Sequence, residues 1–307
     1  MQVTKQPHVY EVFASVGAAS LLEFRSQFQR LHDESPLRAA KLFLYYLGCR
    51  GLDPIAQAMA FWATSGTMYI SLLLDTSEAR ADSLSPEIAS HALPHLNELD
   101  PQFLFKLARS MAALTEPAAL LRALTLAPAL GDYSILIPWL RSLVHHSNTH
   151  VRSRAAKILC QLRPNKGLLS RHMQSPDPRV RASVMEALWQ PKILPPANDI
   201  LPLFRSALAD PNHRVVANAL VGLYRFGETD ALLKMIALSS DKQHMFRAAT
   251  AWAMGVVDDS RAVPILRQLR FDPSFTVRQR AATSLHTLLP LETDIYDTVS
   301  DLQVLPA

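Results

Sequence analysis

The chain has 307 residues, of which 49% are apolar and 19% are charged, enough apolar side chains for one large or two ordinary folded domains. Only 9 glycines accompany 21 prolines, a balance that favours helices joined by short turns and argues against a fold rich in β-hairpins. Two cysteines, Cys49 and Cys160, exclude a disulfide framework and lack Cys-x-x-Cys spacing, so we expect free thiols in a reducing, cytoplasmic compartment.

Four segments within residues 1–130 have the periodicity of amphipathic helices. They are residues 21–31, 37–47, 86–96 and 103–114. They do not share a register: Asp100-Pro101 imitates a repeat turn, but Arg109 falls four residues after the nearest apolar anchor candidate, Phe105. We therefore expect residues 1–130 to form irregular helical pairs that serve as a cap or as a separate interaction surface, and no secretory signal is expected at their start.

One stretch, residues 54–74, contains no charged side chain over about the length that spans a bilayer. Gln57 and the polar cluster 64–67 split it into two short apolar pieces. The pattern favours a buried helical hairpin over a transmembrane helix.

A short phrase recurs through the second half of the chain, and an apolar anchor near its end sets the register. The five anchors are Val151, Val180, Val215, Phe246 and Val277. Their separations of 29, 35, 31 and 31 residues suit one helical hairpin per repeat. The longest interval contains the proline-rich stretch 190–196, which predicts an extended connection.

Each anchor is expected in the first turn of the second helix of its repeat, because apolar or small residues follow it at positions four and eight. The residues three positions before the anchors are Asn148, Asp177, Asn212, Gln243 and Ser274. All but the glutamine are N-cap types. Thirteen residues before three anchors stand Pro138, Pro202 and Pro264, which are expected to bend the first helix of the repeat.

This combination of a first helix with an interior proline, a turn with Asp-Pro and a second helix opening with Val-Arg resembles the HEAT-repeat family, in particular the short repeats of bilin-lyase-like proteins. The resemblance covers roughly residues 131–289. It implies an all-α fold, an α-solenoid of about five stacked helical hairpins, between the N-terminal cap and a C-terminal tail at 290–307.

In the resembling family, a turn aspartate and the arginine after the anchor form a ladder that joins neighbouring repeats. Here only the last two repeats have both residues, Asp241 with Arg247 and Asp272 with Arg278. The third repeat has Val216 at the arginine position. A continuous ladder through the first three repeats is therefore not expected.

Charge is distributed unevenly along the chain. Residues 131–289 contain 21 Lys and Arg against 11 Asp and Glu, whereas residues 1–130 contain 10 against 12 and the tail contains none against 4. The basic array is expected to attract an acidic protein segment or a nucleic-acid backbone. The acidic tail is expected to be a solvated end, with folding over the array as the alternative.

In the resembling family the second helices line the inner face of the array, so that positions three, six and ten after each anchor point into a groove. The residues expected there to contact a partner are Arg154, Lys157, Asn218, Arg225, Trp252 and Arg280. They combine cationic, amide and aromatic groups, which often anchor interfaces. For Trp252, packing in the core is an equal alternative.

Sequence motifs for catalysis are not found, neither a G-x-S-x-G elbow nor a P-loop nor a dinucleotide fingerprint. Glu87, His91 and His95 have ligand-like helical spacing, but Pro94 lies between the histidines and no metal site is expected. Di-iron HEAT enzymes of the deoxyhypusine hydroxylase kind use His-Glu dipeptides, which this sequence does not contain. No cofactor is expected.

These patterns predict a cytoplasmic, non-enzymatic scaffold or adaptor that binds a protein or peptide through the concave face of the solenoid, away from membranes. The alternative is a DNA-interacting HEAT-like protein, such as an enzyme of the alkylpurine DNA glycosylase kind, since such proteins use a basic concave face with aromatic residues.

Overall fold

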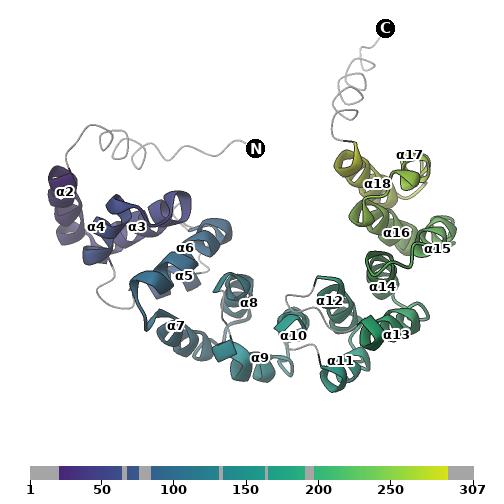
Figure 1. The fold of residues 1–307 in the computed structure, drawn as a ribbon, viewed down its shortest axis with the longest axis horizontal. Helices are drawn as coiled ribbons and strands as arrows, with labels where there is room; N and C mark the ends of the chain where they lie inside the picture. The colour runs from purple at the N-terminus through teal and green to yellow at the C-terminus, as the bar shows by residue number, and fades with distance from the viewer. Residues whose placement is uncertain are drawn as a thin grey trace, which may run out of the picture. The chain divides into compact units, whose positions relative to one another are not determined.

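The structure is a computed structural model that describes residues 21–63, 68–75, 84–130, 134–162, 165–190 and 197–289. Every regular element in these ranges is a helix, which confirms the all-α solenoid (Figure 1). The chain divides into two compact units, Met1–Leu143 and Val144–Ala307. The expected boundary after residue 130 stays a prediction. Within the described ranges, no helix is long and apolar enough to cross a membrane.

Unit 1 contains the helices predicted from periodicity together with shorter ones. In chain order they are α2 (Leu21–Glu34), α3 (Pro36–Arg50), α4 (Pro54–Ala63), α5 (Met68–Leu74), α6 (Pro86–Leu99), α7 (Phe103–Ala112), α8 (Pro117–Leu126), η1 (Ala127–Leu130), η2 (Ser134–Leu136) and α9 (Ile137–Leu143). Prolines open α3, α6 and α8, where the missing N–H costs no helical hydrogen bond. The uncharged stretch 54–74 forms two short helices, α4 and α5, as predicted.

The turn before α7 has its own packing, which explains why its register differs from that of the array. Asp100 accepts hydrogen bonds from the Tyr69 hydroxyl at 2.7 Å and from Lys106 at 2.8 Å. Phe103 is fully buried and stacks on Tyr69, with ring centroids 5.9 Å apart. Phe105, the anchor candidate from the sequence, is instead 64% exposed. The apolar side of α7 therefore starts two residues earlier than that candidate.

Unit 2 is a row of helix pairs. Its elements are α10 (Thr149–Leu162), α11 (Lys166–Met173), α12 (Pro178–Trp189), α13 (Ala197–Ala207), α14 (His213–Arg225), α15 (Ala231–Leu238), α16 (His244–Val257), η3 (Ser260–Ala262), α17 (Val263–Leu269) and α18 (Phe275–Leu288). Consecutive even-numbered helices pack on one another, and α12, α14, α16 and α18 are each backed by the odd-numbered helix before them. In Figure 1 the even-numbered helices line the inner side of this row.

The second helix of each repeat begins two residues before its anchor, at the places that the repeated phrase predicts. The side chains of Asn148, Asp177 and Asn212 accept hydrogen bonds from backbone N–H groups of the first turn, at 2.9 to 3.0 Å. Ser274 makes no such cap, so that expectation was wrong. There Asp272 accepts the Ser274 N–H at 2.8 Å and fixes the turn instead.

The repeated prolines occupy two different helical positions. Pro202 lies inside α13, as expected of a bending residue. Pro138 and Pro264 each lie in the first turn of an α-helix that follows a short 3₁₀ helix. A first-turn proline removes no helical hydrogen bond, so the expected bend at these two residues was wrong; both prolines start α-helices.

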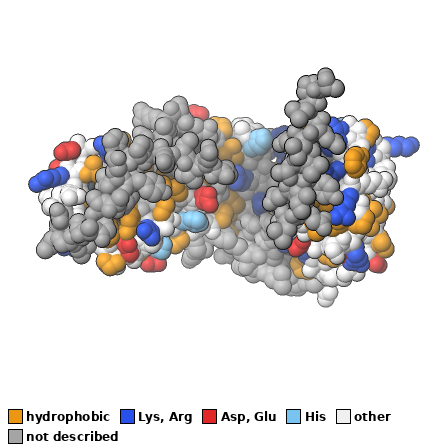
Figure 2. All heavy atoms as spheres, turned by 90° about the horizontal axis from the view of Figure 1, so that it is seen from above, with side chains coloured by type: hydrophobic (Ala, Val, Ile, Leu, Met, Phe, Trp, Pro, Cys, Tyr) orange, Lys and Arg blue, Asp and Glu red, His pale blue; other side chains and the backbone are white. Residues whose placement is uncertain are grey.

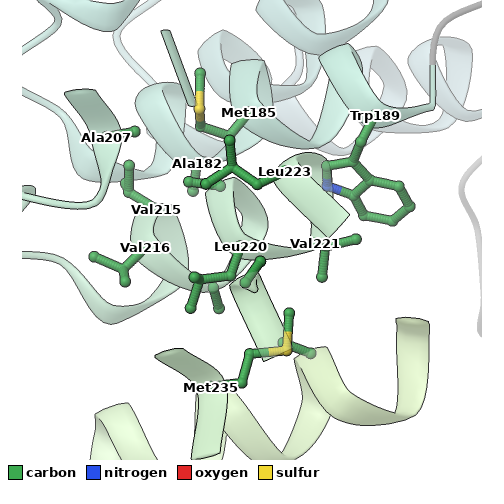
Figure 3. Close-up of a cluster of buried hydrophobic side chains, with 14 of the residues drawn as sticks. Ala182, Met185, Trp189, Ala207, Val215, Val216, Leu220, Val221, Leu223 and Met235 are labelled. Atoms are coloured by element: carbon green, nitrogen blue, oxygen red, sulfur yellow. The ribbon is translucent and has the colours of Figure 1, made fainter. Parts of the chain in front are cut away.

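The anchors form the core between the layers. Val151, Val180, Val215 and Val277 are at most 4% exposed, whereas Phe246 is half-buried with its ring against His213. Figure 3 shows side chains of α14 between those of α12 and those of α15. A buried Val or Leu contributes about 1.5–3 kcal/mol, so this continuous core holds the row together.

Small residues set how closely the helices approach. A Cβ atom on Gly222 would lie 2.2 Å from the ring of Phe204, and one on Gly255 would lie 2.5 Å from the Ser284 hydroxyl oxygen. At the last helix, His286 stands where α16 has Gly255, and it is exposed. Gly255 therefore allows a close approach of α18 to α16 that a larger side chain at this position would not.

Candidate functional site

Arginines join neighbouring repeats of unit 2 into a ladder. Arg181 makes two hydrogen bonds to Asp210, at 2.7 and 2.9 Å, and Arg247 makes two to Asp272, at 2.7 and 2.8 Å. Arg152 bonds to Asp177 at 2.8 Å. We call each arginine–aspartate pair a rung. The rungs hold the turns in fixed positions, and each turn determines where the second helix of its repeat starts.

The ladder corrects the expectation for the first three repeats. Arg152 and Arg181 both have partners, because each arginine reaches the turn of the following repeat. The first rung uses Asp177, two residues after Ser175, which occupies the usual acidic position. The one gap among the described rungs lies between the third and fourth repeats, where Val216 replaces the arginine. Asp241 there accepts a bond from the Gln243 N–H at 2.7 Å.

The rung carboxylates have perturbed acidities. Burial raises the pKa of Asp210, but the hydrogen bonds from Arg181 and from the Asn212 N–H outweigh it and hold the pKa below its usual value. For Asp272, the hydrogen bond from Arg247 is the largest cause of a lowered pKa. Both groups are therefore ionised at neutral pH and bound to structural partners, which leaves them unavailable as general acids.

The inner face of unit 2 is the side of the even-numbered helices that carries positions three, six and ten after each anchor. Several contacts tie this face together. Lys157 pairs with Glu186 at 2.8 Å, and the Gln161 amide donates to the Gln190 carbonyl at 3.1 Å. The Arg225 guanidinium lies 3.3 Å from the Val256 carbonyl. Neighbouring helices are thereby cross-linked along the face.

An aromatic cluster lies in the middle of the inner face. Trp189, 5% exposed, donates its indole N–H to Asn218 at 2.9 Å. The Arg225 guanidinium lies 4.7 Å from the centre of the Trp189 ring, and Trp252 lies with its ring centre 6.4 Å away at 54°. A cation over an indole face is an attractive contact, so Arg225 is held in place although it is exposed.

Three of the six predicted contact residues, Asn218, Trp252 and Arg225, belong to this cluster. They differ in exposure. Asn218 is 4% exposed, accepts from Trp189 and donates to the Arg214 carbonyl at 2.9 Å. Its hydrogen-bonding groups are used inside the protein, where it orients Trp189. Trp252 is half-buried beside it, and Arg225 is exposed above it.

The other three predicted residues lie toward the ends of the face. Lys157 is half-buried in its pair with Glu186. Arg154 on α10 and Arg280 on α18 are exposed, and neither side chain hydrogen-bonds or pairs with a carboxylate of the described residues. Figure 2 shows Lys and Arg side chains interspersed with apolar ones on unit 2. The face thus has free cations at its ends and an ordered aromatic centre.

Trp189 is the residue that the sequence reasoning missed. It lies nine residues after its anchor and ends α12, outside the three positions considered for the inner face.

Few arrangements of side chains suited to catalysis are found among the described residues. They contain no group of three or more His, Cys, Asp or Glu side chains placed to hold a metal ion. Burial raises the pKa of the Cys160 thiol to about 12, which suppresses the thiolate that a nucleophile requires.

Comparison with known proteins supports the repeat assignment. Residues 201–286 match the sequence pattern described as HEAT repeats. No curated protein matches the chain. A solved structure of human deoxyhypusine hydroxylase in complex with glycerol is similar, with 14% sequence identity and a TM-score of 0.33, over 84% of this chain and 99% of that chain. That similarity is too low to bear on activity. The matched repeats, with their stacked helix pairs, place residues 201–286 of this chain in the HEAT-repeat family.

Proposed function

We propose that unit 2 is a non-enzymatic scaffold that binds an acidic protein segment along its inner face. The observation that carries the proposal is the ordered cluster of Trp189, Arg225 and Trp252, which presents a half-buried indole and a stacked guanidinium on one surface. Tryptophan and arginine are the residues most often found at binding hot spots. Because their partners already hold them, little ordering cost remains for binding.

The charge of the inner face favours an acidic partner. Positions three, six and ten after the anchors include four cationic residues, Arg154, Lys157, Arg225 and Arg280, and one acidic residue, Glu186. Lys157 and Glu186 neutralise each other. The three arginines lie on α10, α14 and α18, so positive charge is spread along the row.

The length of the face indicates the size of the bound segment. Neighbouring packed helices lie about 8–10 Å apart, so α10 to α18 span about 32–40 Å along the row. An extended chain advances about 3.3 Å per residue, so a segment of about ten residues would reach from Arg154 to Arg280. The central aromatic cluster would then contact the middle of that segment.

The experiment is affinity capture from native cell extract, with and without nuclease. The test variant combines Arg154→Ala, Trp252→Ala and Arg280→Ala. The control combines Arg179→Ala and Arg214→Ala, which remove two exposed cations just before the anchors. We expect a protein that survives nuclease treatment and is retained by the control but lost by the test variant. Equal retention by all three proteins would exclude the inner face.

The DNA-interacting alternative has its own readout. A fluorescent DNA duplex should bind, and its affinity should fall steeply with salt if unit 2 neutralises several phosphates. A peptide held by aromatic anchors should respond less to salt. Nuclease-sensitive capture combined with a steep salt dependence would replace the scaffold proposal with the DNA one.

A further inference from the structure

Two exposed phenylalanines flank the turn between α17 and α18, outside the inner face: Phe271 opens the turn and Phe275 is the first residue of α18. Phe271 is 87% exposed and Phe275 is 67% exposed. Met245, near the start of α16, is 40% exposed. Arg247 bonds to Asp272 and thereby ties the start of α16 to this turn. We call these three side chains the phenylalanine edge.

The fold does not require aromatic residues at this edge. At the position of Phe271, counted from the anchor, the four preceding repeats have His145, Gln174, Ala209 and Ser240. At the position of Phe275 they have Thr149, Pro178, His213 and His244. Those repeats form the same turn and the same helix start with small or polar residues. The two phenylalanines therefore add apolar surface that stability does not explain.

The edge is held rigidly. The Asp272 carboxylate is bound by Arg247 and by the Ser274 N–H, and Arg278 donates to the carbonyl oxygens of Asp272 and Pro273, both at 2.9 Å. The backbone that follows Phe271 is thus fixed. A preordered aromatic residue loses little entropy when a partner covers it.

Cationic residues accompany the exposed rings. The Arg278 guanidinium lies 5.7 Å from the centre of the Phe275 ring, and Arg270 directly precedes Phe271. Residues 270–280 contain three arginines and a single acidic residue, Asp272, which Arg247 already pairs. The edge therefore combines apolar surface with unbalanced positive charge.

We propose that the phenylalanine edge is a second docking site, for an acidic peptide segment of a partner that carries an aromatic or leucine side chain. The apolar side chain packs on Phe271 and Phe275, and its acidic neighbours approach Arg270 and Arg278. A second copy of this chain is disfavoured as the occupant because it would bring the same arginines face to face. The site is separate from the inner face, so it stands independently of the function proposed above.

The test uses the full chain and fluorescent peptides of about twelve residues, rich in Glu and Asp, each with a central Phe, Trp or Leu pair. Matched peptides replace the acidic residues with Lys or the central pair with Ser. Phe271→Ser and Phe275→His are combined in one variant, because they install the residues that the preceding repeat uses at these positions. Folding is checked by circular dichroism.

We expect acidic peptides with an apolar pair to bind, and the double variant to weaken their binding at least about tenfold. The control Leu233→Ser removes an apolar side chain that is 65% exposed on α15, and it should bind as the wild type does. Fluorine NMR with fluorophenylalanine should show peptide-induced shifts of the Phe271 and Phe275 signals. The proposal is overturned if no peptide of the panel binds below about 1 mM, if the double variant binds unchanged, or if the edge instead drives self-association.

Discussion

Removing a single ladder arginine should destabilise unit 2 well beyond the effect of an exposed charge. Arg181→Met keeps an aliphatic chain of similar length but removes the two hydrogen bonds to Asp210 and those to the carbonyl oxygens of Ser175 and Pro176. The side chains of Arg181 and Asp210 are only 14% and 10% exposed. The substitution therefore leaves a largely buried carboxylate without its cation.

The expected magnitude follows from this burial. Breaking a buried pair by removing one partner costs about 3–5 kcal/mol, whereas an exposed pair contributes about 0.2–1 kcal/mol. Because this pair retains some solvent contact, we expect the lower end of the first range, about 3 kcal/mol. For a domain of this size that corresponds to a fall in Tm of about 6–12 °C.

The assay is urea denaturation followed by far-UV circular dichroism, with Arg179→Met as the matched control. Arg179 lies two residues earlier, is exposed and uses only its backbone N–H in a recorded bond. Its substitution should change the free energy of unfolding by less than about 0.5 kcal/mol. Equal effects of the two substitutions would refute the ladder as the link between repeats.

Three further predictions follow from the same contacts. Asp272→Asn should lower the free energy of unfolding by about 2–3 kcal/mol more than Asp241→Asn, since only Asp272 has a recorded arginine rung; denaturation of both variants measures this. The pKa of Asp210 is lowered on folding, so its stabilisation is present above the unfolded value near 3.8 and is lost as the pH falls through the folded pKa; wild type and Asp210→Asn should therefore converge in stability in acid. With the Cys160 pKa at about 12 and Cys49 exposed, a thiol reagent should label one cysteine quickly in the native protein and two after unfolding; rapid labelling of both would contradict the burial of Cys160.

The starts of the second helices could be predicted from sequence because local signals agree there. The apolar anchor, the cap residue before it and the small residue four positions later all point to one register, as around Val215 with Asn212 and Ala219. The first helices were placed less well, since Pro264 fits equally inside a helix and at its start. Only the preceding 3₁₀ turn decides between them.

The ladder could not be predicted by comparing equivalent positions of the five repeats. A rung joins one repeat to the next, so a mismatch within one repeat, such as Ser175 with Arg181, does not prevent Arg181 from finding Asp210. Arg152 reaches Asp177, a residue whose cap role was recognised and whose second role was not. Side-chain reach across repeats depends on how the helices stack, which the pattern of a single repeat does not contain.

The inner face was inferred from the resemblance to HEAT repeats together with helical periodicity, but the use of each side chain could not be inferred in this way. Arg154, Arg225 and Arg280 are exposed at the predicted positions, whereas Asn218 at an equivalent position is buried. The difference arises because Trp189 of the neighbouring helix supplies Asn218 with a hydrogen-bond donor. Whether a side chain at an inner-face position is exposed thus depends on the contacts that the adjacent repeat offers it.

The most direct test of the account is site-specific photo-crosslinking in cells. A photoreactive amino acid replaces Thr283, an exposed inner-face residue of α18, and in a second protein replaces Leu233, an exposed residue of α15 in the other layer. We expect a discrete protein adduct from position 283 and none from position 233. Equal adducts at both positions, or an adduct at 283 that nuclease removes, would contradict an inner face built to hold a protein segment.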